Sequence, residues 1–414
     1  MKKILLHLLT ALACTLALSV SAQTKVKRNA DGSVNLESEM PADAHKLALG
    51  DAAPDFHLKG VDGKMYSLAD FPASKSPLLM VVFLSNHCPY SHAAENRLIP
   101  LANEFAGKGL SVIAINPNSP EGIDVGELGY SKYNDSYEEM ILYAKEKGFT
   151  FPYAYDGDTQ QTAKDYGCLA TPHVFLFDAQ RKLRYVGRVD DSRFEDIKTV
   201  KTLDARNAVV ELLAGKPVTV ATTTVLGCST KWNSKKGDIV AAEQKWKAEP
   251  VDLALIDAKG VAALAKNATN RYRLINVWAT WCAPCVAEFP ELVSLARRLG
   301  NRDFEFDTIS MDDPKMEKQA KSFLEKQHAV PPGRLKRILK GEGRTGTNYL
   351  YTEASTDDLV KALDPQWPGP LPHTVLIAPG GKIVYRHNGP IDSKEVLAKI
   401  LAELGPYYTP DYVK

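Results

Sequence analysis

The sequence predicts an α/β protein with two copies of one folding unit in tandem, each a mixed central sheet flanked by helices. Segments 79–91 and 273–285 align without gaps, and each has the pattern of a buried strand, a loop with a cysteine and the start of a helix. Segments 171–177 and 371–377 share an X-Pro-His sequence that opens an apolar strand. Because the same order of elements occurs twice, the repeat predicts the architecture.

The remaining elements of each unit follow in the same order. The cysteine loop leads into a helical pattern over 91–107 in the first unit and over 286–299 in the second. A turn and a further strand follow each X-Pro strand, and an amphipathic helix closes each unit, over 204–213 and 393–404. This order predicts an α/β sandwich around a mixed sheet.

A chain of 414 residues is longer than one hydrophobic core sustains, which is about 250–300 residues. We expect five regions: a signal peptide (1–22), a polar disordered segment (23–45), a first domain (46–232), a linker with a helix over 237–248 (233–248), and a second domain (249–414).

The composition excludes several classes of protein. Apolar residues make up 44% and charged residues 24%, which is close to the globular average and excludes a disordered or collagen-like chain. The net charge is +1, from 51 basic and 50 acidic residues, so the chain lacks the basic excess of a nucleic-acid-binding protein.

The first 22 residues have the pattern of a secretory signal peptide. Lys2 and Lys3 precede an apolar run over 4–20, and Val20-Ser21-Ala22 is a small-residue cleavage site. A retained membrane anchor is one alternative, and lipoprotein processing at Cys14 is another, although Ala11-Leu12-Ala13 is a poor lipobox. We expect a periplasmic or otherwise extracytoplasmic protein with no stable membrane insertion after cleavage, because no later apolar run approaches the length of a span.

Cleavage leaves five cysteines: Cys88, Cys168, Cys228, Cys282 and Cys285. The odd number means that they cannot all pair within one chain, so at least one thiol stays free or reactive.

The second half resembles the TlpA/ResA type of extracytoplasmic thiol-disulfide oxidoreductase, within the thioredoxin-like superfamily. The residues that carry the resemblance are Asn276-Val-Trp-Ala-Thr-Trp-Cys-Ala-Pro-Cys285, Glu288, Pro290, Leu292 and the X-Pro at Pro372.

Two cysteines separated by two residues at the start of a helix are able to close a disulfide. Helix N-terminal N–H groups favour a thiolate at Cys282, which attacks a partner disulfide before Cys285 resolves the mixed disulfide. We expect Trp281 to shield the sulfur from water. A structural disulfide or half of a zinc site is the alternative, but zinc needs a second Cys/His pair at ligand spacing, and none is near.

Two more residues are candidates at this site. Glu288 shares a helix face with Cys285, and the resemblance implies that it shuttles the proton of Cys285, whereas plain thioredoxins use an aspartate where Asn276 stands. A solvated glutamate on the helix surface is the alternative. The resemblance also implies a cis-proline loop at Pro372, facing the disulfide, which presents Leu371 to a substrate chain in strand-like pairing.

The stretch between Cys285 and Pro372 is long for a thioredoxin. It contains a Lys-rich segment (326–340) and the segment 364–370, which has three prolines and Trp367. Both a surface insertion and a docking surface fit this pattern.

The first half resembles redoxin-like proteins related to the AhpC/TSA peroxiredoxins. The matching residues are Asn86-His-Cys-Pro-Tyr90, Tyr155-Asp156, Tyr166-Gly167, Thr171-Pro172, Gly187, Asp190-Asp191-Ser192-Arg193 and Gly227-Cys-Ser-Thr-Lys-Trp232. Ser91 stands where Cys285 stands in the second half, so Cys88 lacks a C-x-x-C partner. We expect His87, His92 and His173 to crowd its sulfur, where an imidazolium lowers the pKa of a thiol.

Three uses of Cys88 remain open. A peroxidatic cysteine fits Ser85 three residues earlier, but the proline expected at Val81 and an arginine near Pro172 are absent. A disulfide exchanger needs a resolving thiol, either Cys228 or Cys168, and Cys168 stands two residues away from its usual place before Thr-Pro. A buried, inert Cys88 in a client-binding module is the third use.

A copper or zinc site made of His87, Cys88, His92 and His173 has no familiar ligand spacing, so we expect no cofactor.

The leading hypothesis is an extracytoplasmic thiol-disulfide oxidoreductase that acts on protein thiols and disulfides and takes electrons from a membrane-borne donor. The alternative is a peroxide or sulfenate reductase in which Cys88 is oxidised and the second domain reduces it again. The sequence leaves the direction of electron flow open, because the potentials of such sites span about 150 mV.

Overall fold

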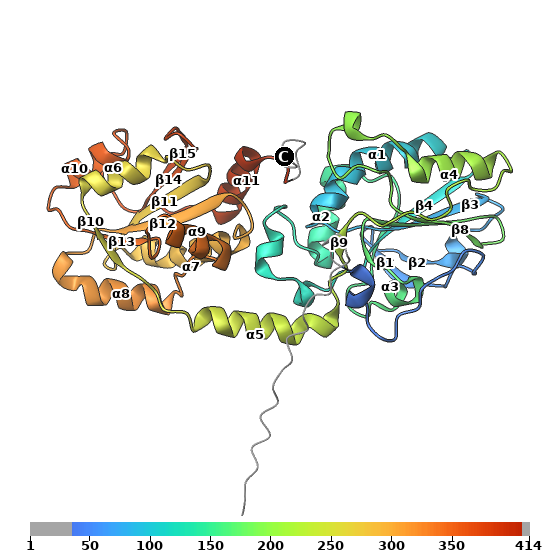
Figure 1. Cartoon of the computed structure of the whole chain (residues 1–414), viewed down its shortest axis with the longest axis horizontal. Helices are drawn as coiled ribbons and strands as arrows, with labels where there is room; N and C mark the ends of the chain where they lie inside the picture. Colours follow the sequence, from blue (N-terminus) through green and yellow to red (C-terminus); the bar gives the residue numbers. More distant parts are fainter. Residues whose placement is uncertain (1–34, 408–414) are drawn as a thin grey trace, which may run out of the picture.

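The computed structural model describes residues 35–407 of the chain, so the expected signal peptide lies outside the described residues. Two sheet-based domains lie side by side, and helix α5 (Lys236–Lys247) runs between them (Figure 1). This arrangement confirms the predicted fold class, two mixed sheets flanked by helices. The helix expected over 237–248 is α5.

The first domain has a seven-stranded sheet in the order β2-β1-β5-β4-β3-β7-β8, and a separate two-stranded ladder joins β6 to β9. Strands β3, β4 and β5 are parallel, β7 pairs antiparallel with β3, and β8 pairs antiparallel with β7. The strands are β1 His57–Gly60, β2 Met65–Ser67, β3 Leu78–Phe83, β4 Leu110–Asn116, β5 Tyr153–Tyr155, β6 Ala170–Thr171, β7 His173–Phe177, β8 Leu183–Gly187 and β9 Cys228–Ser229, and the helices are α1 Pro89–Phe105, α2 Tyr137–Lys147, α3 Gln161–Tyr166 and α4 Asp204–Leu213.

The second domain has a six-stranded sheet in the order β10-β13-β12-β11-β14-β15, of which the first four strands are parallel. The strands are β10 Ala254–Ile256, β11 Tyr272–Trp278, β12 Phe304–Ser310, β13 Asn348–Tyr351, β14 His373–Ile377 and β15 Ile383–Asn388. The helices are α6 Ala258–Lys266, α7 Ala283–Arg298, α8 Glu317–Lys326, α9 Gly333–Gly341, α10 Thr356–Leu363 and α11 Ser393–Leu404.

The central strands explain why each cysteine loop is held firmly. In β3, Met80 and Val82 pack into one hydrophobic cluster, whereas Leu79, Val81 and Phe83 pack into another on the opposite face of the sheet. A strand that is apolar on both faces is stable only in the middle of a sandwich, because side chains alternate between the two faces. The cysteine that follows β3 or β11 therefore lies at the edge of a fixed sheet.

The two domains repeat the same strand register. Leu79 pairs with Phe177 between β3 and β7, and Arg273 pairs with Ile377 at the corresponding place between β11 and β14. Both X-Pro bonds, Thr171–Pro172 and Leu371–Pro372, are cis and directly precede these antiparallel strands. The two kinds of repeated segment therefore lie next to each other in the structure, with the X-Pro loop beside the cysteine loop in each domain.

The prediction that 23–45 is disordered is wrong for its described part, 35–45. This part contains a short 3-10 helix (Leu36–Glu39), and it is held by an ion pair of Asp43 with Lys164 in the first domain and one of Glu39 with Lys235 at the start of the linker. Its polar side chains, which indicated disorder, find charged partners far along the chain.

The end of α7 is bonded to a loop of the first domain. Arg298 donates to the carbonyl oxygens of Leu128 (2.9 Å) and Ser131 (2.6 Å), and Arg302 donates to that of Gly129 (3.1 Å). A Cβ at Gly129 would lie 2.4 Å from the Arg298 carbonyl oxygen, so the close approach requires glycine. On the linker helix, the ring of Trp246 lies 3.7 Å from the Arg297 guanidinium. These contacts join the domains beyond the linker itself.

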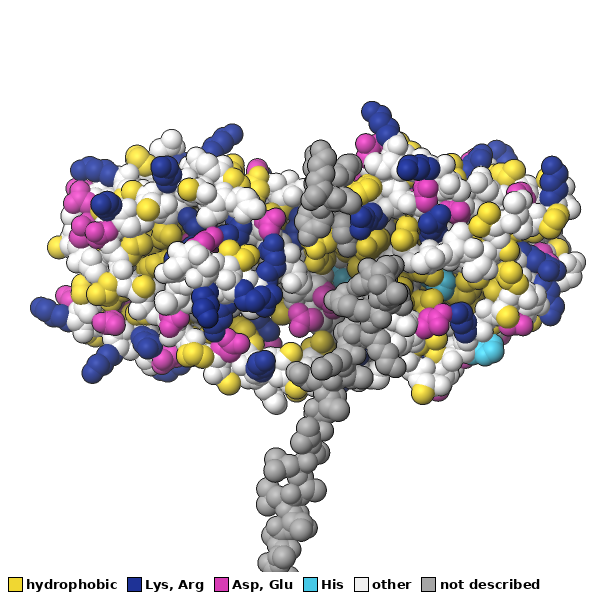
Figure 2. All heavy atoms as spheres, in the orientation of Figure 1, with side chains coloured by type: hydrophobic (Ala, Val, Ile, Leu, Met, Phe, Trp, Pro, Cys, Tyr) yellow, Lys and Arg dark blue, Asp and Glu magenta, His cyan; other side chains and the backbone are white. Residues whose placement is uncertain are grey.

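Basic and acidic side chains are interspersed over the face shown in Figure 2, which agrees with the net charge near zero. Within 35–407, no helix combines the length and apolar character needed to cross a membrane.

Candidate functional site

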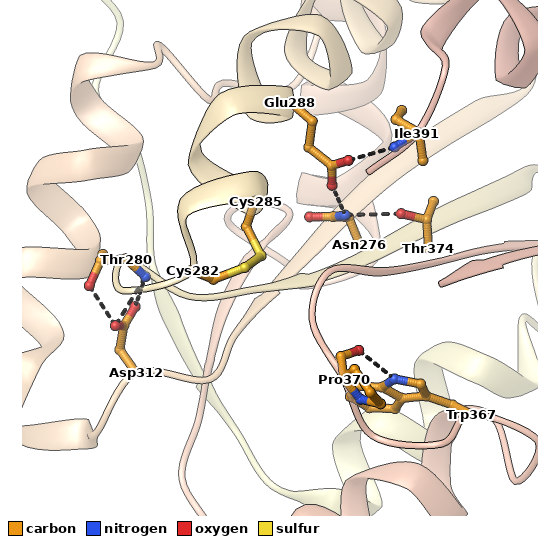
Figure 3. Close-up of a disulfide and its surroundings, with 10 residues drawn as sticks. All are labelled: Asn276, Thr280, Cys282, Cys285, Glu288, Asp312, Trp367, Pro370, Thr374 and Ile391. Atoms are coloured by element: carbon orange, nitrogen blue, oxygen red, sulfur yellow. Dashed lines mark hydrogen bonds between the residues drawn. A yellow bond between two sulfur atoms is a disulfide. The ribbon is translucent and has the colours of Figure 1, made fainter. Parts of the chain in front are cut away.

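The second domain carries a disulfide between Cys282 and Cys285 at the start of α7 (Figure 3). Cys282 is the N-cap residue and Pro284 lies in the first turn, where a missing N–H costs nothing. Cys282 is 6% exposed and Cys285 is fully buried. The outer sulfur is therefore the one that a partner reaches first.

The disulfide packs against a cluster of aromatic side chains. Trp278 is fully buried beside Cys282 and Cys285, and its ring lies 5.0 Å from that of Phe289 and 4.8 Å from that of Phe323. Trp281 is 69% exposed. The expectation that Trp281 shields the sulfur is therefore wrong, because Trp278 fills that place and Trp281 projects into solvent.

Glu288 is buried next to the disulfide and is held in place by hydrogen bonds. Its carboxylate accepts from Asn276 Nδ2 (3.0 Å) and from the backbone N–H of Ile391 (2.8 Å), and Asn276 Nδ2 also donates to Thr374 Oγ1 (3.0 Å). Burial raises the pKa of Glu288, and these bonds only partly offset the effect. Figure 3 shows Glu288 and Cys285 on the side of α7 that faces Asn276. The alternative of a solvated glutamate does not hold.

The segment 364–370 supports the cis-proline loop. Trp367 is buried, donates from Nε1 to the Pro370 carbonyl oxygen (2.8 Å) and stacks on the ring of His373 at 4.6 Å. Asp364 forms an ion pair with Arg386 on β15. This part of the long stretch is therefore packed structure, whereas the Lys-rich segment forms α9 and the end of α8, with Lys336 paired to Glu249.

Cys88 occupies the matching place in the first domain, as the N-cap residue of α1. Its sulfur is fully buried and lies 3.0 Å from the carbonyl oxygen of Thr171, directly before the cis proline Pro172. Ser91, which replaces the second cysteine, accepts a hydrogen bond from the backbone N–H of Ser85 (3.3 Å).

A buried carboxylate orients the histidine next to Cys88. Asp135 lies 2.7 Å from His87 Nδ1 and also accepts from Asn118 Nδ2 (2.7 Å) and from the Asn86 backbone N–H (2.6 Å). Burial opposes a charged His87, but the Asp135 carboxylate outweighs it and raises the pKa of His87. His87 Nε2 is buried without a hydrogen-bond partner among residues 35–407.

Cys228 is the cysteine that meets Cys88. Strand β9 pairs with β6 so that Cys228 lies opposite Thr171, and the Cys228 thiol donates a hydrogen bond to the Cys88 sulfur. Burial works against a thiolate at Cys88, yet this bond and the charge on His87 lower the pKa of Cys88 to about 6. The same bond raises the pKa of Cys228.

Cys168 takes no part in this contact. It lies in the core cluster around Phe83, and its sulfur is 3.4 Å from both the Ala170 carbonyl oxygen and Thr230 Oγ1. Burial raises the pKa of Cys168 to about 12, so it is an inert core thiol.

The family comparisons agree with this geometry. Residues 49–186 match the AhpC/TSA family, and residues 245–401 match the Redoxin family. The chain consists of two redoxin-type, thioredoxin-like domains in tandem. This confirms the predicted tandem organisation. The second redoxin domain is similar in sequence to thiol:disulfide interchange proteins.

Two curated proteins and one solved structure are similar to parts of this chain. The thiol:disulfide interchange protein DsbE homolog of Paracoccus denitrificans (strain Pd 1222) is 30% identical over 132 residues, which are 32% of this chain and 59% of that protein. The thiol:disulfide interchange protein DsbE of Vibrio cholerae serotype O1 (strain ATCC 39315 / El Tor Inaba N16961) is 25% identical over 166 residues, which are 39% of this chain and 78% of that protein. The crystal structure of a hypothetical protein from Sinorhizobium meliloti 1021 has 36% identity, a TM-score of 0.41, and coverage of 46% of this chain and 98% of that chain.

Of the three histidines expected around Cys88 in the first redoxin domain, only His87 acts on its sulfur. His92 Nε2 lies 2.7 Å from the Asn86 carbonyl oxygen, and His173 Nδ1 accepts from the Leu169 backbone N–H (3.3 Å). Burial lowers the pKa of both, so both are neutral. Within the described part of the chain, no three His, Cys, Asp or Glu side chains converge as metal ligands.

Sequence reasoning missed three charged residues of the first redoxin domain: Asp135, Lys231 and Glu127. The Lys231 ammonium pairs with Glu127 at 2.5 Å and lies close enough to Cys88 and Cys228 to interact with their charge. Lys231 stands in the Gly227–Trp232 motif, which was the available signal, whereas nothing in the sequence around Asp135 indicates its contact with His87.

Replacing Glu288 by glutamine tests its role as the proton acceptor of Cys285. We expect the rate of disulfide exchange at pH 7 to fall on the order of 10²-fold, because a positioned acid or base contributes at least this much. We expect the rate of the parent protein to rise with pH as Glu288 ionises, at its raised pKa, and we expect the variant to lack this rise. The measurement is the pH profile of protein disulfide reduction.

Glu291→Gln is the matched control, since Glu291 is an exposed glutamate on the same helix. A Glu288→Gln profile that matches that of the parent and the control would show that Glu288 has no part in proton transfer.

Proposed function

We propose that the protein is an extracytoplasmic thiol-disulfide oxidoreductase that exchanges disulfides with protein substrates through Cys282 and Cys285. One observation carries the proposal: a closed disulfide at a helix N-terminus, with its inner sulfur buried beside a carboxyl group of raised pKa. A purely structural disulfide needs neither the helix N-terminus nor the acid.

The exchange balances in two steps. With the pair reduced, the Cys282 thiolate attacks one sulfur of a substrate disulfide, forms a mixed disulfide and releases one substrate thiolate. Cys285 then passes its proton to Glu288 and attacks the Cys282 sulfur, which closes the Cys282–Cys285 bond and releases the second substrate thiolate. The reverse sequence oxidises a substrate dithiol.

The loop before β14 is the proposed binding site of the substrate chain. Leu371 precedes the cis proline and is only partly buried, so its backbone is available for strand-like pairing. Trp281 offers an exposed aromatic surface directly before Cys282. These features favour an extended protein segment as substrate.

The proposed location and electron source rest on the sequence. The pattern of residues 1–22 supports export, and a dithiol site in an oxidising compartment needs reduction by a membrane-borne donor if it acts as a reductant.

The test is a redox titration of the full-length protein in graded dithiothreitol and glutathione buffers, followed by alkylation and mass spectrometry of peptide 274–297. We expect Cys282 and Cys285 to interconvert reversibly between thiols and disulfide. A midpoint near about −270 mV makes the protein a reductant and one near about −120 mV an oxidant. A disulfide that never opens under these conditions would exclude the proposed function.

A further inference from the structure

In the first redoxin domain, the chain itself occupies the place where a substrate strand would pair. Strand β9 runs antiparallel to β6, directly before the cis proline Pro172, and Cys228 lies opposite Thr171. Gly227 makes the approach possible, because a Cβ there would lie 2.5 Å from the Thr171 carbonyl oxygen. The backbone N–H of Thr230 also donates to the Leu169 carbonyl oxygen (3.2 Å). This fastened segment, 227–231, is called the strap below.

The strap places the sulfur of Cys228 next to that of Cys88. Cys228 lies opposite Thr171, whose carbonyl oxygen is 3.0 Å from the Cys88 sulfur, and the thiol and backbone N–H of Cys228 favour a negative charge on that sulfur. Cys88 has no solvent exposure, whereas Cys228 is partly exposed. The arrangement matches a resting disulfide exchanger with an inner and an outer sulfur.

The surroundings stabilise negative charge on the inner sulfur. Cys88 caps the N-terminus of α1, and the Asp135 carboxylate at 2.7 Å from His87 Nδ1 favours the protonated form of this neighbouring ring. The Lys231 ammonium lies on the strap and is held by Glu127. Cys88 is therefore a good leaving group, which is what opening a disulfide at Cys228 requires.

We propose that Cys88 and Cys228 form a second redox-active pair, which exchanges disulfides with protein dithiols and disulfides through Cys228 as the outer sulfur. This pair is separate from Cys282–Cys285 and does not depend on the proposed function of the second domain.

The exchange again balances. A thiolate of a partner dithiol attacks Cys228 of the closed pair, and the S–S bond breaks with its electrons on Cys88. The second partner thiol then attacks the partner sulfur of the mixed disulfide, which releases Cys228 and leaves the partner oxidised. In the opposite direction Cys228 attacks a partner disulfide, and Cys88 resolves the mixed disulfide.

The experiment uses the full-length protein in graded dithiothreitol and glutathione redox buffers, which together span reducing and oxidising potentials, with acid quenching, alkylation and tryptic mass spectrometry. Cys88, Cys168, Cys228 and the Cys282–Cys285 pair fall in the separate peptides 76–97, 165–181, 207–231 and 274–297. We expect peptides 76–97 and 207–231 to become joined by a disulfide reversibly, with a tenfold change in the thiol-to-disulfide ratio for about every 30 mV. Peptide 274–297 reports the other pair in the same sample, so the two proposals fail separately.

Three outcomes would overturn the proposal: both thiols stay free at every potential, Cys88 joins Cys168 instead, or peroxide leaves a sulfenate on Cys88 with no bond to Cys228. Cys168→Ser is the control and should leave the joined peptides unchanged, because its hydroxyl is able to keep the bond to the Ala170 carbonyl oxygen.

A second measurement tests which sulfur is the outer one. Oxidised glutathione should modify Cys228 in Cys88→Ser at least about tenfold faster than it modifies Cys88 in Cys228→Ser, because serine preserves the volume of the strap and Cys88 stays covered. Equal rates in the folded proteins, with equal rates in guanidinium as reference, would refute Cys228 as the point of entry.

Discussion

Replacing Cys282 by serine is expected to lower the rate of protein disulfide reduction by at least about 10³-fold, because a serine hydroxyl is neither ionised at neutral pH nor able to form the mixed disulfide. Cys285→Ser is expected to behave differently. It keeps the attacking sulfur but lacks the resolving one, so it accumulates as a covalent complex with the substrate. The measurements are the rate of insulin reduction and the yield of mixed disulfide on a non-reducing gel.

Cys168→Ser is the matched control for both variants, since Cys168 is buried in the first domain away from any exchange. Insulin reduction that survives Cys282→Ser at the parent rate would move the activity to another pair of thiols, for which Cys88 and Cys228 are the candidates.

Replacing Arg344 by alanine is expected to destabilise the second redoxin domain by roughly 3–5 kcal/mol, the usual cost of removing one partner from a buried ion cluster. Glu305 and Asp307 lie fully buried on β12. Arg344 pairs with Glu305 and lies 2.8 Å from Asp307, while Arg271 and Arg273 pair with the same carboxylates at 2.9 Å. Without Arg344, the buried carboxyl groups of Glu305 and Asp307 lose a main source of charge compensation.

The loss in Arg344→Ala should grow as the pH rises. Burial and the charge of Glu305 already raise the pKa of Asp307, so its acid form is favoured in the fold, and the unpaired charge becomes costly only as the carboxyl ionises. The measurement is urea unfolding followed by tryptophan fluorescence at several pH values.

Lys361→Ala is the control for Arg344→Ala, because the Lys361–Asp358 pair is exposed and should contribute less than about 1 kcal/mol. Equal unfolding midpoints for the two variants would contradict a stabilising role for the buried cluster.

Much of the architecture followed from patterns in the sequence, and the reasons differ between the two sites. The helices expected over 204–213 and 393–404 begin and end at these residues in the structure, because their apolar periodicity is strong. The two cysteines of the Cys282–Cys285 site are only three residues apart in the sequence, so their spacing alone was enough to predict the disulfide.

The first site depends on contacts that sequence patterns do not encode. His87 and Asp135 are 48 residues apart, and their contact follows from how the loop before α2 folds over the sheet edge. Cys228 reaches Cys88 through β6 and β9, strands of two residues each, which are too short to leave a periodic signal. The order in 35–45 arose in the same way, from charged partners distant in the chain.

Because β9 already pairs with β6, any peptide that binds at this place in the first domain must displace β9. A tethered strand competes at an effective concentration on the order of millimolar, so a free peptide of ordinary abundance will not displace it. The second domain has no such internal competitor among its described strands. A protein partner of the first domain is therefore expected to reach Cys228 from outside the strap, without displacing it, whereas an extended segment is expected to pair directly with the loop at Leu371.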